Sequence, residues 1–370
     1  MDEFLSKEDG MNILAINSSP RTGGQSKTEL MLNHLVEGMR EAGADVEVVN
    51  LREKKIDHCL GCFACWSKSP GQCIQQDDMT REIFPKWLQA DIAVYATPLY
   101  FHTINSAMAT FRERTLPAIL PFFELGADGK VFHPLRSKVP ASVYLSVCGF
   151  PESSEFDALS AYLNHTRHKD TTIVAEIYRS AAESMTNPLF KERLNDILAA
   201  THQAGREIIE KKKVAPATLE RIRQPLVDSK LFAQMGNLVW KSCIAEGVTP
   251  KTFKEKNMVP RPDSLESFML LLQLGLNSRA AGDKQVVLQF DFSGQVKESC
   301  YFSIETGKVD AQKGAAKSAD LVIETPFDLW MDIMTRKADG QQLLLEQKYK
   351  VTGDLGLMIA LFKPEDGAGQ

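Results

Sequence analysis

The first two hundred residues alternate short apolar runs with stretches of helical periodicity, and this alternation constrains the fold more than any other feature. The apolar runs lie at 11–17, 45–51, 91–100, 139–147 and 171–178. The helical stretches between and after them lie at 26–42, 78–89, 106–116 and 188–213. Strands that alternate with helices of this length form a doubly wound α/β fold around a parallel sheet.

Five such strands suit the flavodoxin-like order 2-1-3-4-5. In sheets of this kind, ligands bind beyond the carboxyl ends of the strands, where the strand order reverses. The loops that follow the first, third and fourth strands are therefore the places to look for a site.

The length of 370 residues predicts two domains at roughly 100–200 residues each. We expect an α/β domain at 11–213, a helical connector at 214–262 and an α+β domain at 263–363. A net charge of −5 argues against a nucleic-acid surface. No apolar run reaches the roughly 18 residues of a membrane span, and the acidic first ten residues are unlike a secretory signal, so the expected location is cytoplasmic.

The loop after the first expected strand has the composition of an anion-binding loop. It reads SSPRTGGQSKT from residue 18 to residue 28 and leads directly into a helix. Hydroxyls, glycines and a helix amino terminus offer N–H donors to an anion, and Arg21 can add a charge-assisted contact. The loop is neither GxGxxG nor a Walker A loop, because Ser26 stands where the latter needs glycine. An ordinary turn with Ser26 as N-cap also explains these residues.

This loop resembles the phosphate loop of the NAD(P)H-dependent FMN reductase family, in the flavodoxin-like superfamily. Two more segments agree: TPLYFH at 97–102, continuing to Arg112-Glu113-Arg114, and SVCGF at 146–150. Arg112 and Glu113 replace a lysine and an aspartate that are usual in the family, which preserves the charge but not the geometry of any ion pair. The resemblance covers about 11–210 and implies FMN, NAD(P)H as co-substrate, and a homodimer.

The resemblance assigns FMN to residues of these three loops. They are Ser18, Ser19, Pro20, Arg21, Thr22, Gly23, Gln25, Ser26, Lys27, Thr28, Thr97, Pro98, Leu99, Tyr100, Phe101, Ser146, Cys148 and Gly149. Tyr100, Phe101 and Phe150 are candidates to flank the flavin ring, and Thr97 to meet its polar edge, although core packing explains each aromatic residue equally well. Because a flavin supplies the redox chemistry itself, we predict no catalytic side chain.

Four of the seven cysteines, Cys59, Cys62, Cys65 and Cys73, lie within fifteen residues. Four thiolates at this spacing can hold a [4Fe–4S] cluster, and the segment is similar to that of iron–sulfur flavoproteins. Relatives also keep the pattern CxGCxxCW…GxCxxxDDM as a metal-free loop, in which thiols behave as small apolar groups. We favour the metal-free loop and keep the cluster as its main alternative, ahead of zinc or a redox disulfide.

From residue 263 the pattern is α+β. Asp263 or Ser264 can cap an apolar helix, and 286–292 alternates like a half-buried antiparallel strand. Further strands are expected at 297–304, 308–313, 319–325 and 349–354, and helices at 326–335, 340–347 and 355–362.

The order of these elements resembles the sterol-carrier-protein type 2 lipid-binding domain. The resemblance rests on 320–330, on the helix pair with Gly340 and on YKVTGDL at 349–355. It implies a tunnel for a lipid or another hydrophobic small molecule. The candidate lining residues are Phe268, Leu272, Phe290, Phe302, Trp330, Leu357 and Phe362, and for each of them we favour core packing.

The sequence thus predicts an FMN-dependent NAD(P)H oxidoreductase that passes a hydride through FMN to a quinone-like or other hydrophobic acceptor, fused to a lipid-binding domain. One alternative is an iron–sulfur flavoprotein that carries electrons. Another is a lipid-binding or lipid-transfer protein with a flavin-sensing domain.

Overall fold

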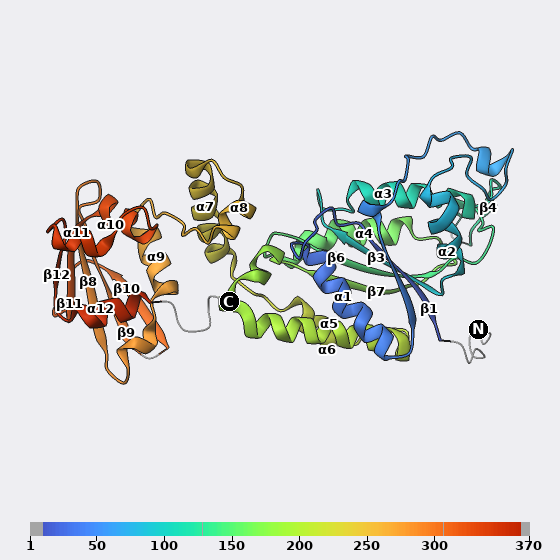
Figure 1. The fold of residues 1–370 in the computed structure, drawn as a ribbon. Helices are drawn as coiled ribbons and strands as arrows, with labels where there is room; N and C mark the ends of the chain where they lie inside the picture. Colours follow the sequence, from blue (N-terminus) through green and yellow to red (C-terminus); the bar gives the residue numbers. More distant parts are fainter. Residues whose placement is uncertain (1–9, 128, 306, 364–370) are drawn as a thin grey trace. The chain divides into compact units, whose positions relative to one another are not determined.

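The computed structural model of the protein describes residues 10–127, 129–305 and 307–363. The chain divides into two compact units, with the division between Ser229 and Lys230 (Figure 1). Within the described residues, no helix combines the length and the apolar character that crossing a membrane requires.

The first unit is built on a five-stranded sheet in which all neighbouring strands are parallel. The strands are β1 (Asn12–Asn17), β2 (Asp45–Asn50), β3 (Ile92–Pro98), β6 (Ala141–Val147) and β7 (Ile173–Arg179). Their order is β2-β1-β3-β6-β7, which confirms the flavodoxin-like order expected from the sequence. Every residue of the central strand β3 is buried, as expected for a strand covered on both faces.

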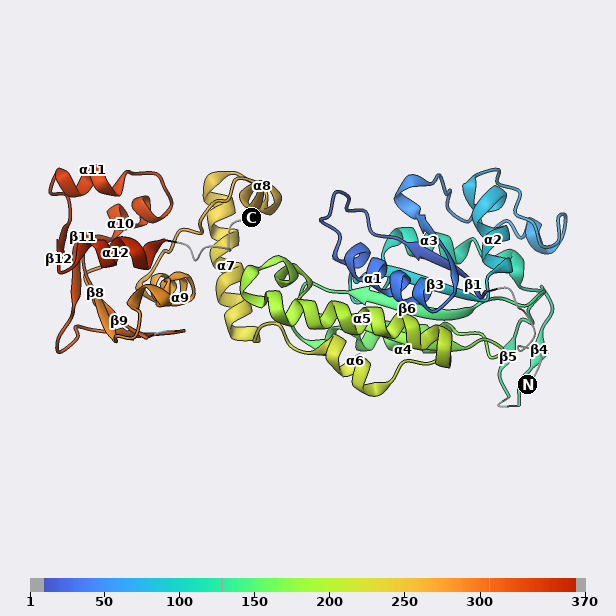
Figure 2. The same ribbon diagram turned by 60° about the horizontal axis from the view of Figure 1, so that its bottom comes forward.

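Each face of this sheet has its own hydrophobic core because successive side chains of a strand point to opposite faces. Ile13 and Ala15 of β1 belong to one core, and Leu14 and Ile16 belong to the other. The first core is covered by α1 (Lys27–Glu41), α5 (Lys191–Lys211) and α6 (Pro216–Arg223). The second is covered by α2 (Phe84–Gln89), α3 (Ser106–Glu113) and α4 (Asp157–Thr166) (Figure 2).

Helices α1 and α5 approach so closely that only glycine fits at their crossing. A Cβ atom on Gly38 would lie 1.9 Å from the backbone oxygen of His202, and one on Gly205 would lie 2.0 Å from that of Leu35. Both clashes are with backbone atoms, so a side chain at either position would push the helices apart. The contact fixes α1, and therefore the loop that precedes it, against the sheet.

Two features of this unit differ from the expectation. The predicted helix at 78–89 begins with a π-helical turn, Met79–Ile83, before α2. A short hairpin, β4 (Glu124–Leu125) and β5 (Val131–Phe132), was not predicted. Its strands have only two residues each, and Leu125 and Val131 are exposed, as are Phe122 and Phe123 just before β4, so the segment lacks the alternation that identifies a strand.

The division falls after the first residue of α7 (Ser229–Glu246), and the second unit contains the rest of α7, α8 (Pro250–Glu255) and a sheet covered by helices. Its strands are β8 (Val286–Ser293), β9 (Ser299–Glu305), β10 (Lys308–Lys313), β11 (Leu321–Pro326) and β12 (Lys350–Thr352). Its helices are α9 (Leu265–Gly275), α10 (Phe327–Met334), α11 (Gly340–Leu345) and α12 (Leu355–Phe362). Ser264 caps α9 through a capping box with Ser267, which confirms one of the two predicted caps.

The sheet order is β10-β9-β8-β11-β12. Strand β8, expected to be antiparallel, pairs antiparallel with β9 but parallel with β11, so the sheet is mixed. The reason is that the chain crosses from the edge strand β10 to the far side of β8 before β11 begins.

Most of the candidate tunnel residues lie in the core of this unit. Phe268, Leu272, Phe290, Phe302 and Trp330 are buried, and Leu357 and Phe362 pack against them. The ring centroids of Phe268 and Phe290 are 4.9 Å apart, and those of Phe290 and Trp330 are 5.1 Å apart. These contacts confirm the favoured interpretation that the residues are core side chains.

Candidate functional site

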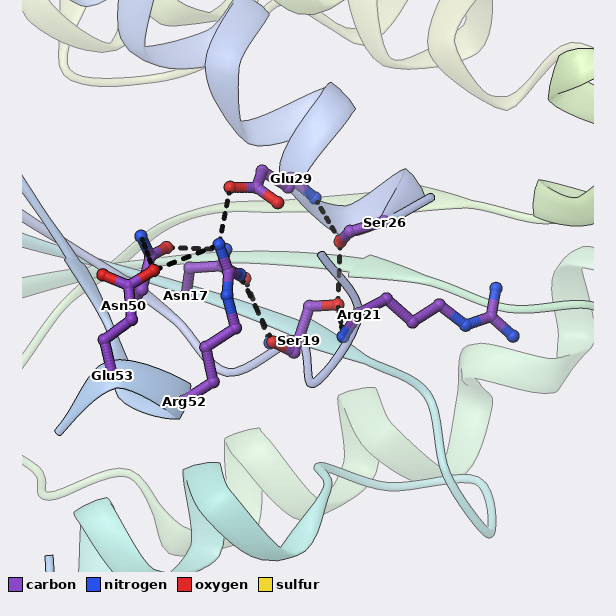
Figure 3. A network of polar contacts seen from close by, with 8 residues as sticks. All are labelled: Asn17, Ser19, Arg21, Ser26, Glu29, Asn50, Arg52 and Glu53. Carbon is purple, nitrogen blue, oxygen red and sulfur yellow. Dashed lines mark hydrogen bonds and ion pairs between the residues drawn. The ribbon is translucent and has the colours of Figure 1, made fainter. Parts of the chain in front are cut away.

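A hydrogen bond between Ser19 and Ser26 closes the base of the loop after β1. Ser18 and Ser19 are buried directly after the strand, and Ser26 is the N-cap of α1. The Ser26 hydroxyl donates to Ser19 Oγ at 2.7 Å and accepts from the backbone N–H of Glu29 at 3.0 Å (Figure 3). The two ends of the loop are therefore held together, and the N-cap role predicted for Ser26 is confirmed.

Between these serines the loop presents backbone donors. Pro20 to Gly24 are exposed, and Gly23 and Gly24 have positive φ values of 62° and 75°, which favour glycine. The backbone N–H groups of Thr22, Gly23, Gly24 and Ser26 have no acceptor within the described residues. Four such donors at the positive end of a helix can bind an anion.

The two cations of this loop already have partners. Arg21 Nη1 lies 2.7 Å from Glu183 Oε1, and this hydrogen bond raises the pKa of Arg21. Lys27 is buried and its Nζ donates to the backbone oxygen of Gln25 at 3.3 Å. Thr28 is also buried, in the first turn of α1. The donors that face outward are thus mainly backbone N–H groups.

Arg52, which was not among the predicted site residues, lies just after β2 and contacts the base of this loop. Its Nη2 lies 3.0 Å from Glu29 Oε1, and its Nη1 donates to the backbone oxygen of Ser19 at 3.4 Å (Figure 3). Asn17 accepts from the backbone N–H of Ser19 and donates to Asn50. Because β1 and β2 are parallel neighbours, residues that follow β2 lie beside the loop that follows β1, and this adjacency was the available signal.

Asn105 connects the loop after β1 to the loop after β3. Its Nδ2 donates to the backbone oxygen of Ser18 at 2.7 Å, and its Oδ1 accepts from the N–H of Met108, capping α3. The hydroxyl of buried Thr97 donates to the backbone oxygen of Pro98 and accepts from the N–H of Asn105. Asn105 lies inside the segment used for the resemblance but was not among the predicted site residues.

The aromatic residues of the second and third loops are exposed rather than packed in a core. Tyr100, Phe101 and Phe150 have exposed fractions of 44%, 100% and 60%. Phe101 also has a positive φ of 48°, a strained conformation for a residue with a side chain. The structure therefore rejects core packing for these three and leaves them available to a ligand.

The third loop contains a buried hydroxyl without a partner. Ser146 is 1% exposed, is in register with Thr97 of β3, and has no hydrogen-bond partner for its Oγ within the described residues. Such a group requires an explanation, and a bound ligand is one. Cys148 is buried, and its burial raises its pKa to about 12, whereas Gly149 is exposed.

The four clustered cysteines line one cavity, together with Leu60, Phe63, Ile74, Gln75, Glu113, Arg114, Leu116 and Pro117. All four are free thiols, with Cys65 buried and Cys62 exposed. Burial, and then the neighbouring Cys73, Cys59 and Cys62, raises the pKa of Cys65. Within the described residues, no group of three or more histidine, cysteine, aspartate or glutamate side chains is placed to share one metal ion.

A buried ion pair anchors the cysteine loop. Arg114 Nη1 lies 2.6 Å from Asp77 Oδ2, and both side chains are 1% exposed. Arg114 also donates to the backbone oxygen of Asp57 and to Thr80, so it joins the end of α3 to both sides of the loop. Burial favours a higher pKa for Asp77, but hydrogen bonds from Arg114, Asp57 and Thr80 lower it below its ordinary value.

The two residues that depart from the family pattern do not form this ion pair. Arg112 donates to Thr166 Oγ1 at 3.0 Å and lies over the ring of Tyr162. Glu113 lines the cysteine cavity.

An aromatic series connects the cysteine loop to the hairpin β4–β5. Ring centroids are 5.0 Å apart for Phe63 and Trp66, 4.9 Å for Trp66 and His133, and 4.6 Å for His133 and Phe123. The hairpin that the sequence did not predict therefore braces the loop that carries the thiols.

Comparison with known proteins gives relatives that match part of the chain. An iron-sulfur flavoprotein of Archaeoglobus fulgidus is 35% identical over 107 residues, which cover 29% of this chain and 46% of that protein. An iron-sulfur flavoprotein of Methanocaldococcus jannaschii is 33% identical over 104 residues, which cover 28% of this chain and 50% of that protein. The chain spans about half the length of the curated relatives it matches.

Among solved structures, an NAD(P)H:quinone oxidoreductase from Methanothermobacter marburgensis is similar, with a TM-score of 0.41 and 15% identity over 54% of this chain and 96% of that chain. The family described as NADPH-dependent FMN reductase matches residues 11–148, and the family described as SCP-2 sterol transfer matches residues 275–363. The chain thus carries one region that is similar to the NADPH-dependent FMN reductase family and another that is similar to the SCP-2 sterol transfer family.

Proposed function

We propose that the first unit binds FMN and acts as an NAD(P)H-dependent oxidoreductase. When bound, FMN would accept a hydride from NAD(P)H and pass electrons to an acceptor. The observation that carries the proposal is the set of four backbone donors between Thr22 and Ser26, which have no acceptor within the described residues. The family match over 11–148 supports it.

Residues of the three loops would contact different parts of the cofactor. The N–H groups of Thr22, Gly23, Gly24 and Ser26 would bind the phosphate, which needs donors rather than side-chain charge. The exposed rings of Tyr100, Phe101 and Phe150 would cover the flavin ring. The unpartnered hydroxyl of Ser146 would bond to a polar edge of the ring. We assign no proton transfer to a side chain.

For the second unit we propose binding of a hydrophobic small molecule or lipid, and for the acceptor a quinone-like or other hydrophobic compound. The SCP-2 match over 275–363 supports the first proposal, and the fusion of the two regions supports the second. We also propose that the protein is a cytoplasmic homodimer. Its domain boundaries are proposed to lie at 213 and 262, as expected from the sequence.

The test is anaerobic reduction of the FMN-loaded full-length protein by NADPH and by NADH, followed by stopped-flow absorbance. We expect at least one of the two to bleach the flavin within seconds, and a quinone to restore its colour. FMN that remains oxidised with both would contradict the oxidoreductase proposal. Comparing a water-soluble with a long-chain quinone tests the acceptor, since equal rates would remove the preference for hydrophobic acceptors.

A second candidate function is electron transfer through FMN and a [4Fe–4S] cluster. It is favoured by the observation that Cys59, Cys62, Cys65 and Cys73 line one cavity. Such a cluster takes one thiolate from each cysteine, so it does not require several side chains to share a single ion. The relatives described as iron-sulfur flavoproteins are consistent with this candidate.

Anaerobic purification followed by iron and sulfide assays decides between the cluster and the metal-free loop. The cluster requires iron and inorganic sulfide in equal amounts, lost in Cys65→Ser and retained in Cys243→Ser. Cys243 is a matched control because it is buried in the second unit, outside the loop. Iron near zero in a protein with full flavin content would support the metal-free loop.

A further inference from the structure

Residues 26–29 have the sequence of a capping box, but only half of the box is formed. In this motif the N-cap serine accepts from the N3 backbone N–H, and the N3 glutamate reaches back to the N-cap N–H. Ser26 makes the first bond, to the N–H of Glu29 at 3.0 Å. The second bond is absent within the described residues, and the Ser26 N–H has no acceptor there.

The glutamate is held elsewhere by Arg52. Glu29 Oε1 lies 3.0 Å from Arg52 Nη2, and Figure 3 shows the carboxylate turned toward the guanidinium. The Arg52 side chain is only 16% exposed and also donates to the backbone oxygen of Ser19. Its position is therefore fixed by the base of the loop as well as by Glu29.

We propose that Arg52 is a positioning residue that keeps the capping box of α1 open, so that the Ser26 N–H stays available to a phosphate. This inference rests on the proposed binding of FMN. Without Arg52, the Glu29 carboxylate returns to the Ser26 N–H from the same helical turn. It then occupies one of the four donors and places a negative charge where the phosphate binds.

The effect is specific to ligands that carry a phosphate. A closed box lowers the fraction of protein competent to bind, and the apparent dissociation constant rises in proportion. We expect Arg52→Met to raise the dissociation constant for FMN about tenfold, which corresponds to a box that is closed in about nine molecules of ten. Riboflavin, which has the same ring and no phosphate, should bind as it does to the parent protein.

Substitutions of Glu29 separate the capping box from the loss of a charge. Adding Glu29→Ala to Arg52→Met removes both the competing acceptor and the uncompensated charge, so FMN affinity should return to within about twofold of the parent. Adding Glu29→Gln removes the charge but leaves a side chain that can still close the box, so recovery should be partial. Glu29→Ala alone should bind FMN like the parent.

Fluorescence titration of FMN and riboflavin against these full-length proteins is the experiment. Equal recovery with alanine and glutamine would overturn the inference, because charge alone would then explain the loss. No recovery with alanine would also overturn it, since Arg52 would then act only by supporting the loop. If the parent protein itself takes up no FMN, the proposed function fails, and this result is distinct from both outcomes.

Discussion

Aromatic side chains that are candidates for a ligand site are exposed in the first unit and mostly buried in the second. Phe101 of the first unit is fully exposed, whereas Phe290 of the second is fully buried among other rings. Both are candidates for a ligand site in the sequence, where core packing explains Phe101 equally well and is the favoured interpretation for Phe290. An exposed aromatic side chain at the carboxyl end of a parallel sheet indicates a binding surface, whereas one on an inward strand position belongs to the core.

Removing one ring from each unit tests this contrast and has the largest expected effect. Phe290→Ala leaves a cavity in a packed aromatic core, so we expect it to lower the free energy of unfolding of the second unit by about 3–5 kcal/mol. Phe101→Ala removes an exposed ring and should change stability by less than about 0.5 kcal/mol while weakening FMN binding.

Hydrogen exchange measured by mass spectrometry reads each unit separately, so it does not require the whole chain to unfold in two states. Fast exchange in β8 and β9 is expected only for Phe290→Ala. If Phe101→Ala destabilised the first unit as strongly, the contrast between the two rings would be lost.

Arg114 and Asp77 form an ion pair that is as deeply buried as the hydrophobic core. Arg114→Met leaves the Asp77 carboxylate buried without its partner and should cost the first unit about 3 kcal/mol or more. Arg21→Met, which breaks an exposed pair with Glu183, should cost less than about 1 kcal/mol. Protection of the peptides around residues 57–80 is the measurement, and similar losses for the two variants would contradict the assignment.

The same ion pair predicts a pH dependence. The pKa of Asp77 is lower in the folded protein than its ordinary value of 3.8, so the folded state favours the ionised form. Its contribution is fully present above that ordinary value and is lost as the pH falls toward the folded pKa. Acid unfolding of the first unit should therefore be shallower in Asp77→Asn than in the parent below about pH 4, and parallel curves would count against this role.

The smallest expected effect is a difference between cysteines in their reactivity toward an alkylating reagent. It can be measured on the parent protein. Burial raises the pKa of Cys148 and of Cys300 to about 12, so neither should react with iodoacetamide at pH 8 while the protein is folded. Cys62 is exposed at the cavity and should be alkylated first. Peptide mapping after a short exposure checks the order, and early labelling of Cys148 would show that the third loop opens.

The strand order of the first unit was predictable because strands that alternate with helices form a doubly wound parallel sheet, and five such strands suit the flavodoxin-like order. The parallel pairing of β8 with β11 was not, since alternation along a strand carries no information about its neighbour's direction. The hairpin β4–β5 could not be predicted because its strands have two residues each, and Leu125 and Val131 are exposed.

The composition of the loop at 18–28 predicted an anion-binding loop, whereas the residues that support this loop could not be predicted. Arg52 and Asn105 act on Ser19 and Ser18 across strands that are far apart in the sequence, so their roles depend on strand order. The FMN contacts themselves and the domain boundaries at 213 and 262 stay predictions.

The central claim is that the backbone donors between Thr22 and Ser26 hold the phosphate of FMN. Equilibrium titration of the flavin-free full-length protein with FMN and with riboflavin tests it most directly. We expect one FMN per chain, bound at least about tenfold more tightly than riboflavin. Equal affinity for the two flavins, or no uptake of either, would contradict it.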